Sequence, residues 1–190
     1  MKAQSSTQLL NWLDERVRVN LDLINALESL TDAQLRQNPA SGGWNALQAV
    51  EHVNIWNRGY LERVSAALRG HRSTSAASFT STWIGNYFAT MLKPGPESKK
   101  IATLKSFNPQ GQQLDRRVLA TFRRQTAELQ RLLGEARGAD LNRIRIKTVL
   151  TSLIKMRLGD VLRMMVYHDW RHLEQACRAA GVPVREMAEV

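Results

Sequence analysis

Two histidines four residues apart, His168 and His172, are the residues in this chain best placed to do chemistry. On a helix this spacing puts their Cβ atoms about 6 Å apart. Both rings could then reach one metal ion at about 2.0–2.1 Å. Helical period also places them on a stripe of apolar residues that faces the core: Leu158, Val161, Leu162, Met165, and beyond the histidines Gln175 and Ala179. Ring nitrogens on such a stripe need partners away from water, so the pair indicates either metal ligands or core histidines bonded to carbonyl or carboxylate groups.

The neighbours of the pair offer further polar groups. Asp169 follows the first histidine as Glu does in His-Glu-x-x-His zinc proteases. A carboxylate near the site or on the surface is the favoured interpretation, with a general base as the alternative, and the same holds for Glu51 and Glu174. Gln175 lies about one turn after His172 and could hydrogen-bond to a ligand ring. Four large apolar side chains are expected to pack rather than to line a substrate site: Trp56, Trp170, Met164 and Met165.

The chain holds two more histidines. His52 lies on the flank of the apolar stripe of a helix expected over about 45–69, with small Ala49 and Gly59 leaving room beside it. His71 follows the exposed end of that helix, and we expect it to be solvated and without a role.

The hydrophobic pattern predicts four amphipathic helices, over about 6–27, 45–69, 113–136 and 158–180. Asn45 is the expected N-cap of the second helix, and Gly70 its end. A short turn is expected over 32–35, after the cap Thr31, and a short helix over about 81–92 within the long connection 71–112. Segment 141–157 mixes strand-like and helix-like patterns, and we interpret it as an irregular connection. Four amphipathic helices with little strand signal predict an all-α bundle.

Composition indicates one soluble globular domain over 1–190, with 43% hydrophobic and 23% charged residues. We see no membrane span and no signal-peptide core, and the single cysteine excludes an intramolecular disulfide, so we expect a cytoplasmic protein. Cys177 is expected to pack as a small hydrophobe. The net charge of +10 raises nucleic acid or an acidic membrane surface as partners. Because the basic residues are spread through every segment, we expect neither as a partner.

Three stretches stand in order: Trp44 to Val53, which ends near His52, then Leu158 to Leu162, then His168 to Gln175. This order resembles the DinB/YfiT-like family of metalloenzymes, in its DinB superfamily form, over nearly the whole chain. The resemblance implies that His52, His168 and His172 are three metal ligands. It also implies a four-helix bundle in up-down-down-up order, with a long crossover between the second and third helices.

Three neutral imidazoles suit Zn²⁺, Ni²⁺ or Fe²⁺ and leave a position for water or a substrate atom. The family resemblance implies thiol-dependent transferases and isomerases, in which a low-molecular-weight thiol binds the metal, and metal-dependent hydrolases. We therefore expect a metal-dependent enzyme that acts on small molecules, with S-transfer ahead of hydrolysis and zinc or nickel ahead of iron. The alternative is a non-catalytic bundle whose basic surface binds nucleic acid or an acidic protein.

The two connections hold more apolar residues than connections need. These residues are Trp83, Tyr87, Phe88, Ile144, Ile146, Val149, Leu153 and Ile154. We predict that part of this surface is buried in a symmetric homodimer, a habit that the family resemblance also implies.

Overall fold

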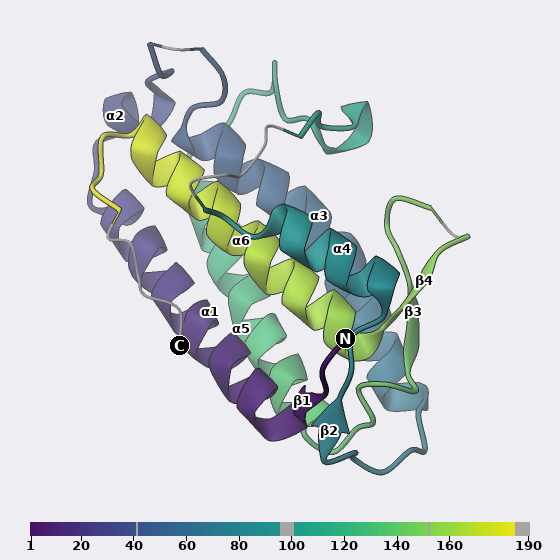
Figure 1. Cartoon of the computed structure of the whole chain (residues 1–190). Helices are drawn as coiled ribbons and strands as arrows, with labels where there is room; N and C mark the ends of the chain where they lie inside the picture. Colours follow the sequence, from purple (N-terminus) through teal and green to yellow (C-terminus); the bar gives the residue numbers. More distant parts are fainter. Residues whose placement is uncertain (41, 96–100, 152, 185–190) are drawn as a thin grey trace.

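The computed structural model describes residues 1–40, 42–95, 101–151 and 153–184, and these are mostly helical (Figure 1). Its helices are α1 (Ser6–Glu28), α2 (Asp32–Arg36), α3 (Ala46–Gly70), α4 (Trp83–Leu92), α5 (Arg117–Ala136) and α6 (Leu158–Ala179), with a 3₁₀ turn η1 (Lys105–Phe107). The predicted single domain includes residues 185–190, and the predicted long connection includes 96–100; both lie outside the described residues. Among the described helices, none is both long and apolar enough to cross a membrane.

The four long helices run alongside one another (Figure 1). Helix α3 packs against α5 and α6, α1 packs against the same two helices, and α4 lies on α6. Fully buried side chains fill the space between them, among them Leu13, Ile24, Tyr60, Phe122 and Leu129. The all-α expectation is therefore confirmed as a mostly helical fold with a few short strands.

Helix α3 begins where the sequence predicts. The side chain of Asn45 accepts a hydrogen bond from the backbone N–H of Gln48 at 3.0 Å, and the Gln48 amide oxygen accepts one from the N–H of Asn45 at 3.1 Å. This reciprocal capping box satisfies two of the free N–H groups at the helix start. It fixes the first turn of the helix that carries His52 two turns later.

The third long helix begins later than predicted, at Arg117 rather than 113. The carboxylate of Asp115 accepts a hydrogen bond from the backbone N–H of Arg117 at 2.9 Å, so a side chain satisfies a donor at the helix start. Leu114 therefore precedes this helix. It packs from the loop against the core.

The expectation of an irregular connection over 141–157 was wrong. Strands β3 (Arg145–Lys147) and β4 (Lys155–Arg157) pair antiparallel there, with Ile146 opposite Met156. Both of these side chains are buried. A second small ladder joins β1 (Gln4–Ser5) to β2 (Ser78–Phe79). Because Ile144 and Ile146 are buried within the chain's own core, they are not available to the dimer surface that the sequence suggested.

A buried carboxylate fastens α4 to α6. Asp160, in the first turn of α6, is fully buried and accepts hydrogen bonds from the N–H and the hydroxyl of Thr82, both at 3.1 Å, and from the hydroxyl of Ser81. Thr82 is the N-cap of α4. A Cβ atom added at Gly85 would lie 2.0 Å from the Asp160 carboxylate, so only glycine allows this approach. The contact positions the start of the helix that carries His168 and His172.

Candidate metal centre

Helices α3 and α6 bring three of the four histidines together. One ring nitrogen from each of His52, His168 and His172 lies within 4.8 Å of the other two. His52 and His168 are buried, whereas the side chain of His172 is partly exposed. His71 lies outside the cluster; it is half-buried instead of solvated, and its ring accepts a hydrogen bond from the N–H of Ser73 at 3.2 Å.

Two of the three rings are held through Nδ1. His52 Nδ1 lies 2.7 Å from the carbonyl oxygen of Phe107, and His172 Nδ1 lies 2.8 Å from the side-chain oxygen of Gln175. A backbone carbonyl and an amide oxygen can only accept, so each Nδ1 carries the hydrogen. The Nε2 atom of each ring therefore presents a lone pair. The hydrogen bond that the sequence suggested for Gln175 is present.

The imidazole ring of His168 contacts that of His52 directly. His168 Nε2 lies 3.0 Å from His52 Nε2, and the ring of His168 stacks on Trp56 with 4.4 Å between centroids. A hydrogen on His168 Nε2 could be donated to the lone pair of His52 or to that of His172, but a single hydrogen cannot satisfy both acceptors. A divalent cation could accept the lone pairs of all three nitrogens as a shared ligand set. Core histidines bonded to carbonyl groups, the alternative interpretation, account for His52 and for Nδ1 of His172, whereas Nδ1 of His168 is buried without a hydrogen-bond partner among the described residues.

The electrostatics of the cluster favour neutral rings. Burial lowers the pKa of His52 below its ordinary value, although the bond to Phe107 acts in the opposite direction. Burial, and then the nearness of the other two rings, holds the pKa of His168 well below its usual range. Burial and His52 lower the pKa of His172 to about 3. Neutral imidazole is the form that ligates a metal.

Aromatic side chains enclose the cluster. The ring of Trp44 lies 4.7 Å from that of His52 and 5.9 Å from that of His172. Trp56 packs between His168 and Phe107, whose ring is 5.5 Å away. Such a wall excludes water and strengthens electrostatic interactions inside it.

The other packing predictions hold. Trp170, Met164 and Met165 belong to the buried core, as does Trp56. Cys177 is fully buried beside Leu173, and burial raises the pKa of its thiol to about 11, so it packs as a small hydrophobe.

The three candidate carboxylates do not hydrogen-bond to the histidines in the part of the chain that the structure describes. Asp169 is buried and accepts a hydrogen bond from the Asn57 amide at 2.9 Å; burial raises the pKa of Asp169 to about 8, although the bond to Asn57 acts in the opposite direction. Glu51 accepts from Asn54. Glu174 accepts from the indole N–H of Trp170 at 2.6 Å. Asp169 is thus not a surface carboxylate, and it forms no hydrogen bond to a clustered histidine among the described residues.

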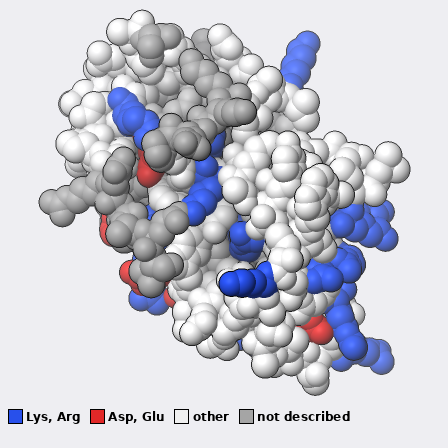
Figure 2. All heavy atoms as spheres, viewed as in Figure 1, with Lys and Arg blue, Asp and Glu red and all other residues white. Residues whose placement is uncertain are grey.

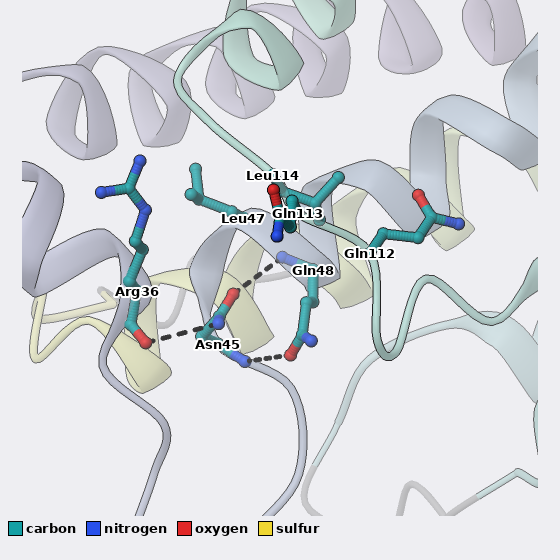
Figure 3. Close-up of a pocket in the computed structure, with 7 residues that line it drawn as sticks. All are labelled: Arg36, Asn45, Leu47, Gln48, Gln112, Gln113 and Leu114. Carbon is teal, nitrogen blue, oxygen red and sulfur yellow. Dashed lines mark hydrogen bonds between the residues drawn. The ribbon is translucent and has the colours of Figure 1, made fainter.

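A polar hollow of about 370 Å³ lies at the start of α3 (Figure 3). It is lined by Arg36, Asn45, Leu47, Gln48, Gln112, Gln113 and Leu114, and so by one guanidinium and four amides without a carboxylate. Asn45, Gln48 and His52 stand at positions i, i+3 and i+7, on one stripe of α3. The segment after Phe107 supplies the opposite wall. The three histidines are not among the lining residues, but the same two segments border both features.

Sequence reasoning missed the partners that orient the rings. Phe107 contributes a backbone carbonyl, which any residue could supply, from within a long connection. Asn57, which holds the Asp169 carboxylate and not a histidine ring, stands five residues after His52 and has the pattern of an ordinary polar residue on a helix. Only the amide of Gln175 carried a usable signal, because its spacing from His172 placed it one turn away.

Comparison with known proteins agrees with this geometry. The family model of the DinB superfamily matches residues 15–176, a span that includes all three clustered histidines. Neither the curated proteins nor the solved structures gave a match. The chain belongs to the DinB superfamily.

Proposed function

We propose that this DinB superfamily protein binds one divalent metal ion through His52, His168 and His172, and that it uses the ion in a reaction on a small molecule. The observation that carries the proposal is the convergence of three nitrogens, of which two are already fixed as lone-pair donors. Three imidazoles suit zinc or nickel first and iron next. Membership of a superfamily whose members often bind metals supports the same assignment.

The chemistry we propose is thiol-dependent S-transfer, with hydrolysis as the second candidate. A bound divalent ion lowers the pKa of a thiol or a water molecule and makes it nucleophilic at neutral pH. The chain's own part is to hold three neutral rings, to exclude water with Trp44, Trp56 and Phe107, and to leave access beside His172. The polar hollow at Asn45 and Gln48 offers hydrogen-bond donors for the rest of the substrate.

We also infer that α1, α3, α5 and α6 form a four-helix bundle in up-down-down-up order, with the crossover between α3 and α5. The packing of α1 and of α3 against the same two helices supports this order. So does the path of the chain in Figure 1. In such a bundle, ligand side chains from facing helices meet in the interior.

Elemental analysis of protein purified without a metal-affinity tag tests the metal. We expect about one divalent ion per chain in the wild type and in His71→Ala, and much less in His168→Ala. Protein that neither retains nor takes up metal would contradict the proposal.

Cobalt-substituted protein then separates the two reactions. Titration with cysteine should produce a sulfur-to-cobalt charge-transfer band if a thiol joins the ion. A cobalt protein that gives no such band, but cleaves a model ester in a His168-dependent way, would favour hydrolysis instead.

A further inference from the structure

The hairpin of β3 and β4 exposes a face made entirely of basic residues. Its inner positions, Ile146 and Met156, are opposite each other and buried. Its outer positions pair Arg145 with Arg157 and Lys147 with Lys155. Each outer pair thus places two like charges directly across the ladder.

Like charges directly opposite each other destabilise a strand pair. Arg145, Lys147 and Lys155 form no ion pair with an acidic residue in the described part of the chain. Only Arg157 is engaged, because it donates to the carbonyl of Thr80. The hairpin therefore carries a repulsion that a partner of opposite charge would relieve.

The fold holds this hairpin firmly on α3. The guanidinium of Arg63 donates to the carbonyl of Lys147 at 3.0 Å and to that of Thr148. The hydroxyl of Tyr60 accepts from the backbone N–H of Val149 at 3.2 Å. The hairpin projects beyond the helices (Figure 1).

Two leucines stand at the tip of the hairpin. Leu153 is 90% exposed and Leu150 is 39% exposed, and both lie between Lys147 and Lys155 in the chain. In Figure 2, lysine and arginine side chains gather on the side where Figure 1 places the hairpin. A hollow of about 430 Å³ continues this basic surface at the base of β3; its lining includes Arg72, Arg143 and Arg145.

We propose that this hairpin docks the protein on an anionic membrane surface, with the basic stem at the headgroups and the leucine tip in the interface. Lysine and arginine near an anionic bilayer each contribute about 1 kcal/mol of attraction, and apolar side chains add by burial at the headgroup boundary. Nucleic acid would match the charge but would leave Leu153 in water. A second copy of the hairpin would set basic residues against basic residues. The sequence alone indicated dispersed charge and no membrane partner; the register of this ladder changes that expectation.

Flotation of the intact protein with phosphatidylcholine vesicles, with and without phosphatidylserine, tests the proposal. We expect binding only when phosphatidylserine is present. Removal of one basic charge should weaken it about fivefold, so Lys147→Glu, which reverses the charge, should weaken it further. Leu153→Ser should weaken binding at unchanged charge. Lys147→Glu should also raise the melting temperature slightly, because its side chain then faces Lys155 with the opposite charge.

Arg124→Glu is the matched control. It makes the same change in net charge on α5, where the Arg124 side chain is exposed and bonds only to Thr121 among the described residues. We expect this variant to bind vesicles nearly as the wild type does. Equal losses of vesicle binding in Arg124→Glu and Lys147→Glu would overturn the proposal, since the attraction would then depend on the net charge of the protein and not on the hairpin. Tight binding of duplex DNA at physiological salt, lost in Lys147→Glu while vesicles stay unbound, would assign the hairpin to nucleic acid and also overturn it.

Discussion

Nδ1 of His172 donates a hydrogen bond to Oε1 of Gln175 at 2.8 Å, and this contact determines which nitrogen of His172 can bind a metal. Partners of this kind orient the ligand ring and raise its basicity, and their loss typically costs 10–100-fold in metal affinity, roughly. We expect Gln175→Leu to weaken divalent metal binding by about that factor. Competition against a chelating dye measures it.

The conservative variant Gln175→Glu keeps an acceptor at the same place, so its metal affinity should stay near that of the wild type. Both variants should unfold at temperatures close to the wild type when metal-free, because Gln175 is only partly buried. If Gln175→Leu bound metal as tightly as Gln175→Glu does, the contact would have no positioning role.

Chelation should destabilise the metal-loaded protein. A ligand that binds only the native state adds about 2.7 kcal/mol at a free concentration of 100 times its dissociation constant. We expect the melting temperature to fall by several degrees when a chelator is added to the wild type. His52→Ala should show no such shift, and His71→Ala should show the full shift. A wild type indifferent to chelator would argue for ordinary core histidines.

The helices that matter most for the site could be predicted because their signals are long and redundant. The helix over 158–180 repeats apolar residues through six turns, and Asn45 and Gln48 mark the start of α3 with a capping box. The β3–β4 hairpin could not be predicted, because strand-like alternation covers only Arg143 to Ile146. Four residues of alternation do not outweigh the helix-like leucines and isoleucines that follow.

The site was predictable to a similar degree. Spacing alone paired His168 with His172, but His52 joined them only through the family resemblance, since a histidine on the flank of a helix has no signature of its own. His172 was expected in the core and is partly exposed.

Gly85→Ala should be strongly destabilising. The added methyl group would stand 2.0 Å from the buried carboxylate of Asp160, which Thr82 holds in place. Forced overpacking costs about 1–3 kcal/mol and sometimes more. Gly134→Ala is the matched control within α5, where an added Cβ meets nothing within 4 Å. It should be stabilising by roughly 0.5–1 kcal/mol. Urea unfolding of the two variants measures both effects, and similar stabilities would refute the tight α4–α6 contact.

The homodimer remains a prediction, and α4 is now the surface that best supports it. Trp83 and Tyr87 are 76% and 54% exposed, and their rings stack with 6.0 Å between centroids. Two such faces could bury each other about a two-fold axis. We expect sedimentation to show a dimer that Trp83→Ser weakens. A single species of 21.5 kDa at high concentration would exclude it.

The buried carboxyl of Asp169 should make stability fall as pH rises. Burial raises its pKa from 3.8 to about 8, so between these values the native state holds a proton that the unfolded state releases. Its contribution is complete below about pH 4 and is lost as pH rises toward 8. The clustered histidines act in the opposite sense: their lowered pKa values reduce stability as pH falls below about 6.5.

The two effects separate in metal-free protein above about pH 7.5, where the histidines are almost entirely neutral in both states. There the stability of the wild type should still fall as pH rises through about 8, by less than about 1.4 kcal/mol per pH unit because Asp169 is itself losing its proton. Asp169→Asn keeps an oxygen that can accept from Asn57 but cannot ionise, so its stability should stay level over the same range. Urea unfolding at several pH values compares them. Parallel curves would mean that Asp169 is already ionised in the native state, and that Asn57 stabilises its charge more than burial opposes it.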